Sequence, residues 1–167
     1  MPIPRPGATA SRSITATLDE ARAATEQVTA RARRLLAIYT PDLEPAIYDD
    51  PRFLETLRKL VLTRGYARVR VLLADPARVI YDASKFVRLA RRITSHIDIR
   101  NIRADYRSNH SAFVIADDRA LYYRAQAAGW HGIVETDDPA VARRYLAWFE
   151  EAWLASDPQA GARQQQQ

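Results

Sequence analysis

Few side chains in this sequence could do chemistry, and their types exclude several mechanisms. Cysteine is absent, which excludes a disulfide framework, a thiolate metal site and a cysteine nucleophile. The three histidines, His96, His110 and His131, are far apart and lack the helical spacing of metal ligands. The five glycines form no phosphate-binding loop, and no Ser-His-Asp arrangement stands out. We therefore expect neither a metal nor a cofactor.

One stretch places a histidine and an aspartate at the two ends of an apolar run. In Asn109–Asp117 (NHSAFVIAD), the apolar residues are typical of a strand, with His110 just before it and Asp117 just after it. From the residues alone, the simpler interpretation of His110 is an exposed or hydrogen-bonded side chain at a strand entrance. The simpler interpretation of Asp117-Asp118-Arg119 is a hairpin turn, because aspartate favours turns through local hydrogen bonds.

This stretch resembles the signature of the phospholipase D superfamily, in which His-x-Lys is followed after four residues by Asp. His110 and Asp117 have the required separation, Asn109 matches a frequent neighbour, and Ala112 stands at the lysine position. The order of the elements before the signature is also similar, so that the resemblance covers roughly residues 34–135. It implies one half of a phospholipase D-like fold, and in that family two halves meet within one chain or in a dimer.

The resemblance also implies roles that this chain fulfils only in part. In the family, one histidine attacks phosphorus, the aspartate orients its histidine, and lysines stabilise the charge on the phosphate oxygens. Ala112 removes that lysine, and the Gly-Ser and Asn positions that bind phosphate next fall on Arg124, Ala125 and Ala127. Loss of one such donor typically costs about 10²–10³ in rate. We therefore expect no working hydrolase.

Three hypotheses follow. In the first, the chain is a non-catalytic phospholipase D-like domain that works by binding, as a homodimer or docked on a partner protein, with Asn109, His110 and Arg124 at the ligand. In the second, it is a residual phosphodiesterase in which His110 is the nucleophile, Asp117 orients it, and Arg124 replaces the charge lost at Ala112. In the third, arginines bind nucleic acid without chemistry.

The basic residues support the third hypothesis. The formal net charge is +5, and only two of the cations are lysines, so most are arginines, whose forks pair well with phosphate. Lys85, Arg88, Arg91 and Arg92 form a cluster that suggests nucleic acid or a phosphorylated ligand. Two simpler interpretations stay open: an arginine-rich genomic composition, and solvated cations at a helix C-terminus that its dipole favours.

The elements that must position these residues alternate along the chain. Apolar and alternating patterns predict strands over residues 13–17, 35–39, 69–73, 97–102, 112–116 and 120–124. Caps, prolines and helical spacing predict helices over residues 19–34, 50–65, 77–92 and 138–155. Strands joined by helices favour crossover connections, so we expect an α/β fold with a mixed, largely parallel sheet and helices on both faces.

The ends of the chain differ in composition from its middle. Prolines, glycines and a glutamine run predict a flexible arm over residues 1–13 and a disordered tail over residues 157–167, around one domain of residues 14–156. No apolar run reaches the roughly 18 residues of a membrane span, and the N-terminus lacks the apolar segment of a secretory signal. By elimination we expect a cytoplasmic protein of a prokaryote, away from membranes.

The last expected helix carries several aromatic side chains. Trp148 lies off the helical stripe of Tyr145, Phe149 and Trp153. An aromatic side chain outside the core-facing stripe indicates an exposed contact for a second copy or another protein.

Overall fold

The computed structural model describes residues 12–158 of the 167-residue chain. The strands in this range are β1 (Arg12–Thr15), β2 (Leu35–Thr40), β3 (Arg68–Leu73), β4 (Ile97–Asn101), β5 (Ala112–Ala116), β6 (Ala120–Arg124), β7 (Gly132–Glu135) and β8 (Asp157–Pro158). These described strands form one sheet in the order β1-β7-β6-β5-β2-β3-β4-β8.

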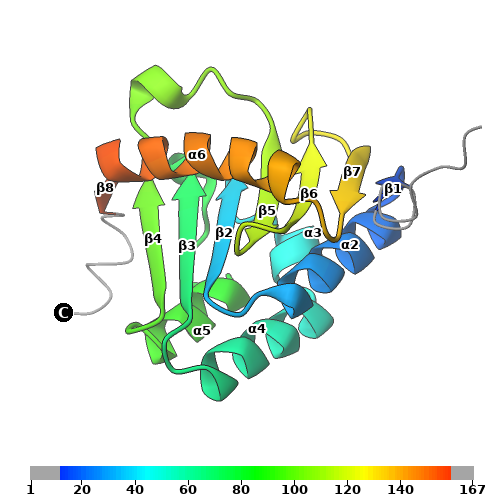
Figure 1. Cartoon of the computed structure of the whole chain (residues 1–167). Coiled ribbons are helices and arrows are strands. Elements are labelled where there is room, and N and C mark those ends of the chain that lie inside the picture. Colours follow the sequence, from blue (N-terminus) through cyan, green and yellow to red (C-terminus); the bar gives the residue numbers. More distant parts are fainter. Residues whose placement is uncertain (1–11, 159–167) are drawn as a thin grey trace, which may run out of the picture.

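Helices cover both faces of the sheet. They are α2 (Leu18–Arg31), α3 (Pro45–Tyr48), α4 (Pro51–Thr63), α5 (Lys85–Arg92) and α6 (Pro139–Ala155), with 3-10 turns at Pro76–Arg78 and Ala104–Tyr106. Figure 1 shows α6 crossing one face, while α2, α4 and α5 lie on the other. The prediction of an α/β fold with helices on both faces is confirmed.

The sheet is mixed, as predicted, but the expectation that it is largely parallel is wrong. β2 pairs parallel with β3, and β3 with β4, and the helical crossovers α3–α4 and α5 make these connections. The other described pairings, β1–β7, β2–β5, β4–β8, β5–β6 and β6–β7, are antiparallel. Short connections such as Asp117–Arg119 between β5 and β6 explain this, because a parallel pair needs a crossover of a dozen or more residues. The alternation of helices and strands in the first half does not continue into the second.

Each central strand contributes to two hydrophobic cores, because successive side chains of a strand point to opposite faces. In β2, Leu36 and Ile38 pack in the core that contains α2 and α4, while Ala37 and Tyr39 pack in the core under α6. All four are fully buried. Burial of one such leucine or isoleucine stabilises the fold by about 1.5–3 kcal/mol. The central strands are therefore packed on both faces, and the polar groups lie in the loops at the two ends of the strands.

The helix expected over residues 77–92 is shorter than predicted. Only Pro76–Arg78 is helical in its first part, as a 3-10 turn, and α5 begins at Lys85. Ser84 caps α5, because its hydroxyl accepts a hydrogen bond from the Val87 N–H at 3.1 Å. A serine that bonds the backbone in this way favours the end of a helix over its interior.

Both ends of the described range pair with the sheet. β1 pairs with β7, so that residues 12 and 13 of the expected arm belong to a strand. Asp157 and Pro158, the first residues of the expected tail, pair with β4. The remainder of the expected arm and tail lies outside the described residues.

Candidate functional site

The signature-like segment begins beside the loops that follow the carboxyl ends of β2 and β3. Asn109 and His110 precede β5, and both line a cavity of about 820 Å³ with the loops that follow β2 and β3. This volume is within the usual range of small-molecule sites. His110 is exposed and Asn109 is half-buried. The structure thus brings together two of the three residues expected at a ligand.

The charges around this cavity do not favour a phosphate. Its charged lining residues, apart from His110, are Asp42, Glu44, Asp75, Arg78 and Arg107. Arg78 already contacts Asp42 at 3.5 Å and Asp75 at 4.0 Å. Arg124 neutralises Glu44, so Asp42 and Asp75 balance Arg78 and Arg107, and the lining has no net positive charge to attract an anionic diester.

The contacts beside His110 fix the backbone of the segment and leave the imidazole without an orienting carboxylate. The Tyr39 hydroxyl donates to the carbonyl of Asn109 at 2.6 Å, and burial raises the pKa of Tyr39 to about 12, so this donor stays protonated. The Asn109 Oδ1 accepts from the N–H and the hydroxyl of Ser111. The His110 carbonyl accepts from the Ala127 N–H at 2.9 Å. Among the described residues, the His110 ring has no hydrogen-bond or ionic partner.

Asp117 does not orient His110, and this part of the prediction is wrong. The two residues lie at opposite ends of β5, and seven residues of extended chain span about 20 Å. The Asp117 carboxylate instead accepts hydrogen bonds from the N–H groups of Arg33, Arg34 and Leu35 at 2.8–3.3 Å. Its backbone is left-handed, with φ at 55°. Asp117 therefore begins the β5–β6 turn, as the simpler interpretation predicted, and anchors that turn to the start of β2.

Arg124 lies directly opposite Ala112 in the β5–β6 pairing, on the same face of the sheet. Its guanidinium is buried, and Nη2 donates to both carboxylate oxygens of Glu44 at 2.6 and 2.7 Å. Nη1 donates to the carbonyls of Ala127 and Gly129 at 2.8 and 2.9 Å. Arg124 thus emerges beside the lysine position, but its positive charge is already neutralised.

Glu44 stands between this guanidinium and the cavity. Glu44 lines the cavity, whereas Arg124 does not. Burial raises the pKa of the Glu44 carboxyl, and the charge and hydrogen bonds of Arg124, with a hydrogen bond from the Thr40 hydroxyl at 3.0 Å, oppose that rise. No local pattern marks Glu44 in the sequence, because its partner is 80 residues away.

The expected basic cluster is assembled only in part. A groove of about 590 Å³ lies between α4 and α5, and its basic lining residues are Arg58, Lys85, Arg88 and Arg92. Glu55 is the one acid among the lining residues. Arg91 does not line the groove, and its Nε and Nη2 are buried without a partner among the described residues.

The expectation that Trp148 is an exposed contact is wrong. Trp148 is half-buried and meets Tyr39 edge to face, with ring centroids 5.0 Å apart. It also packs against Phe113 at 5.9 Å and Tyr106 at 6.2 Å. Trp148 therefore belongs to the core under α6 and indicates no partner surface.

Residues 12–158 contain neither a helix that could cross a membrane nor a group of side chains that could hold a metal ion. In that range, no helix is both long and apolar enough to cross a membrane. Nor does the described part of the chain contain three acidic or histidine side chains grouped so that they could hold a metal ion. His96 has one ring nitrogen, Nδ1, 3.0 Å from the Ala67 carbonyl.

Comparisons with known proteins identify a family for the sequence and similar folds among solved structures. Residues 17–164 match the protein family described as "Domain of unknown function (DUF7931)". No curated protein matches the sequence. Solved structures with a similar fold include TrmBL2, described as an archaeal chromatin protein with a novel mode of DNA binding, at a TM-score of 0.63 and 14% identity. The match covers 89% of this chain and 54% of TrmBL2, so this chain spans about half the length of that protein.

Two further similar structures match over almost their whole length. Nuc from Salmonella typhimurium, a phospholipase D family member, has a TM-score of 0.58 at 14% identity, with 88% of this chain and 97% of Nuc covered. NucT from Helicobacter pylori has a TM-score of 0.57 at 11% identity, with 88% of this chain and 98% of NucT covered. At these identities the likeness establishes the fold alone, which is phospholipase D-like, as the resemblance implied.

Replacement of Asp117 separates its structural role from chemistry. Asp117→Ala removes the acceptor of three backbone hydrogen bonds and puts alanine in a left-handed position, so the free energy of unfolding should fall by about 2–4 kcal/mol. Asp118→Ala is the matched control, because its carboxylate pairs only with the exposed Arg143 and its loss should cost less than about 1 kcal/mol. Urea denaturation measures both; equal effects of the two variants would contradict the anchoring role.

The buried ion pair gives a second stability prediction. Arg124→Met leaves the Glu44 carboxylate buried without its partner and should lower the free energy of unfolding by about 3–5 kcal/mol. The double variant Arg124→Met with Glu44→Leu should recover much of this loss, because no buried charge is then left alone. Denaturant curves of the three proteins test the pair. A double variant as unstable as the single one would show that the pair is not coupled in this way.

Proposed function

This chain belongs to the DUF7931 family, and on that premise we propose that it is a non-catalytic phospholipase D-like domain that works by binding. One observation carries the proposal. Ala112, at the position that the resemblance assigns to lysine, is buried, and the one cation beside it, Arg124, is held by Glu44. No unpaired charge is therefore left at this position to stabilise a developing oxyanion.

The surroundings of His110 support the same proposal. A histidine nucleophile needs a neighbour that fixes its tautomer, and Asp117, the expected neighbour, is bound at the far end of β5. The cavity also offers a phosphodiester no net positive charge, because Asp42 and Asp75 balance Arg78 and Arg107 and Glu44 is paired with Arg124. Both features oppose the attack of an imidazole on phosphorus.

The cavity retains polar groups for a ligand that is not a phosphodiester. The exposed His110 ring and the Asn109 amide line it, beside the indole of Trp130. Association through this face with a second copy, or with a partner protein, stays a prediction.

A phosphodiesterase assay tests the loss of catalysis. The full chain and His110→Ala should both show no hydrolysis above background on a chromogenic diester and on DNA, because the phosphate clamp is absent. Activity that disappears in His110→Ala would overturn the proposal. It would then follow that the missing charge comes either from Arg124, released from Glu44 during turnover, or from a partner subunit.

A second candidate function, nucleic-acid binding without chemistry, has an observation of its own. Arg58, from α4, joins Lys85, Arg88 and Arg92 of α5 along one groove, although the sequence cluster contained only the α5 residues. Among the described residues these cations have no ion-pair partner, and several unpaired cations along one groove suit a phosphate backbone. The DNA-binding description of the similarly folded TrmBL2 agrees with this candidate.

Salt dependence tests this second function. The logarithm of the affinity for duplex DNA should fall linearly with the logarithm of salt concentration, because each phosphate contact releases counterions. Arg88→Gln combined with Arg92→Gln should weaken binding and reduce the slope by about 2. Fluorescence anisotropy at several salt concentrations measures both quantities. Undetectable or salt-independent binding would remove this candidate.

A further inference from the structure

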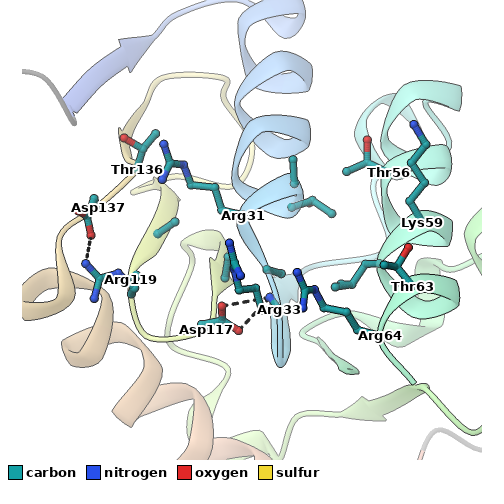
Figure 2. Close-up of a pocket in the computed structure, with 16 residues that line it drawn as sticks. Arg31, Arg33, Thr56, Lys59, Thr63, Arg64, Asp117, Arg119, Thr136 and Asp137 are labelled. Atoms are coloured by element: carbon teal, nitrogen blue, oxygen red, sulfur yellow. Dashed lines mark hydrogen bonds and ion pairs between the residues drawn. The ribbon is translucent and has the colours of Figure 1, made fainter. Parts of the chain in front are cut away.

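A second concave site lies at the edge of the sheet opposite to His110. Its walls are the last turns of α2 and α4, the segment that enters β2, and the β5–β6 turn, and its volume is about 550 Å³. Figure 2 shows this pocket, with Arg64 reaching from the end of α4 toward Arg33 and with Thr56 pointing from α4 toward α2.

The pocket has a strong excess of positive charge. The cations that line it are Arg31, Arg33, Lys59, Arg64 and Arg119, and the carboxylates are Asp117 and Asp137. Only one of these carboxylates neutralises a cation directly, because the backbone N–H groups that bind the other carry no formal charge. Asp137 pairs with Arg119, and Asp117 accepts the three N–H groups at the start of β2.

Four of these cations therefore have no acidic partner among the described residues. Arg31, Arg33 and Lys59 make no ion pair there, and Arg64 donates only to the neutral hydroxyl of Tyr66 at 3.2 Å. In the His110 cavity, by contrast, Arg78 contacts two aspartates, and Arg107 is the one lining arginine without an ion pair among the described residues. Like charges that share one hollow repel one another unless an anion neutralises them.

Helix dipoles do not account for this concentration of charge. Arg31 ends α2, and Arg64 caps the C-terminus of α4, so each lies where a helix end attracts a cation. Each helix end amounts to roughly half a negative charge, and the two together to about one. Four cations exceed this even when the negative charge of Asp117 is added, and Arg33 and Lys59 lie outside the helix ends.

The shape of the pocket indicates which anion fits. A hollow of this volume suits a small molecule better than a duplex, which needs an extended surface. Thr63 adds a hydroxyl donor beside the cations, whereas the Thr56 hydroxyl already donates to the Arg52 carbonyl, and Leu60 adds an apolar wall. Four separate cations match a ligand with several phosphoryl groups better than a single phosphate.

From this arrangement we propose that the pocket between α2 and α4 binds a small ligand with two or three linked phosphoryl groups, such as a nucleoside polyphosphate. Arg33 contacts its phosphates from the segment before β2, and Lys59 and Arg64 contact them from α4 and its C-terminal cap. The site is separate from the His110 cavity, and its occupation does not depend on whether that cavity has lost catalysis.

Calorimetric titration of the full chain in phosphate-free buffer tests the proposal, with tripolyphosphate, pyrophosphate and orthophosphate as probes. Tripolyphosphate should bind with one-site stoichiometry and more tightly than orthophosphate, because each added phosphoryl group meets another cation. Lys59→Gln should weaken this binding about tenfold, the effect of one charge-assisted contact. Arg33→Gln, which changes the opposite wall, should act similarly.

The neighbouring residue on α4 gives the matched control. Arg58 is exposed like Lys59 but lines the α4–α5 groove and not this pocket, so Arg58→Gln should change the affinity for tripolyphosphate by less than about twofold. Equal weakening by Arg58→Gln and Lys59→Gln would reduce the effect to general electrostatics and overturn the proposal. Absence of tripolyphosphate binding at millimolar concentration would also overturn it.

This result is distinguishable from the outcome of the phosphodiesterase assay. Hydrolysis lost in His110→Ala would end the non-catalytic proposal and leave tripolyphosphate binding at Lys59 unaffected. Conversely, a protein that neither hydrolyses diesters nor binds tripolyphosphate would keep the first proposal and lose the second.

Discussion

The buried ion pair of Arg124 and Glu44 joins the two halves of the sheet. Arg124 ends β6 in the antiparallel half, and Glu44 follows β2, which begins the parallel half. Two charges can lie out of water in this way because the guanidinium donates to both carboxylate oxygens and to two carbonyls. The same bonds hold the loop after β2 against the connection from β6 to β7, and both segments form walls of the His110 cavity. The pair that shapes the cavity also removes the cation that a phosphate there would need.

The two edges of the sheet consequently differ in electrostatics. Ligands of open α/β sheets usually bind beyond the carboxyl ends of the parallel strands. In this chain that edge carries Asp42 and Asp75 beside Arg78 and Arg107, and Glu44 is paired with Arg124, so it has no excess of positive charge. Groups of cations without an acidic partner among the described residues lie at the amino end of β2 and between α4 and α5. In this phospholipase D-like fold, the excess of positive charge thus lies away from His110.

Predictions from the sequence succeeded where the evidence was local. The apolar strands over residues 35–39, 112–116 and 120–124 form as expected, because a run with turn residues at its ends needs little tertiary information. The hairpin at Asp117 also forms, since its turn chemistry lies within three residues. The largely parallel sheet and the exposed Trp148 were wrong, because each depends on which distant segments pack together. The resemblance predicted the fold correctly. It also predicted that Asp117 orients His110, whereas the Asp117 carboxylate accepts hydrogen bonds from the backbone before β2.

What the sequence determined by itself is the set of groups that the chain has and lacks: no cysteine, an alanine at the lysine position of the signature, and an excess of arginine. These follow from composition and spacing, which no folding can alter. Tertiary structure decided which charges are free. Arg124 is neutralised by Glu44 from 80 residues away, whereas Arg33 and Lys59 meet across a pocket without an acid to pair with. Coulomb interactions depend on distance through space, and a linear sequence does not contain those distances.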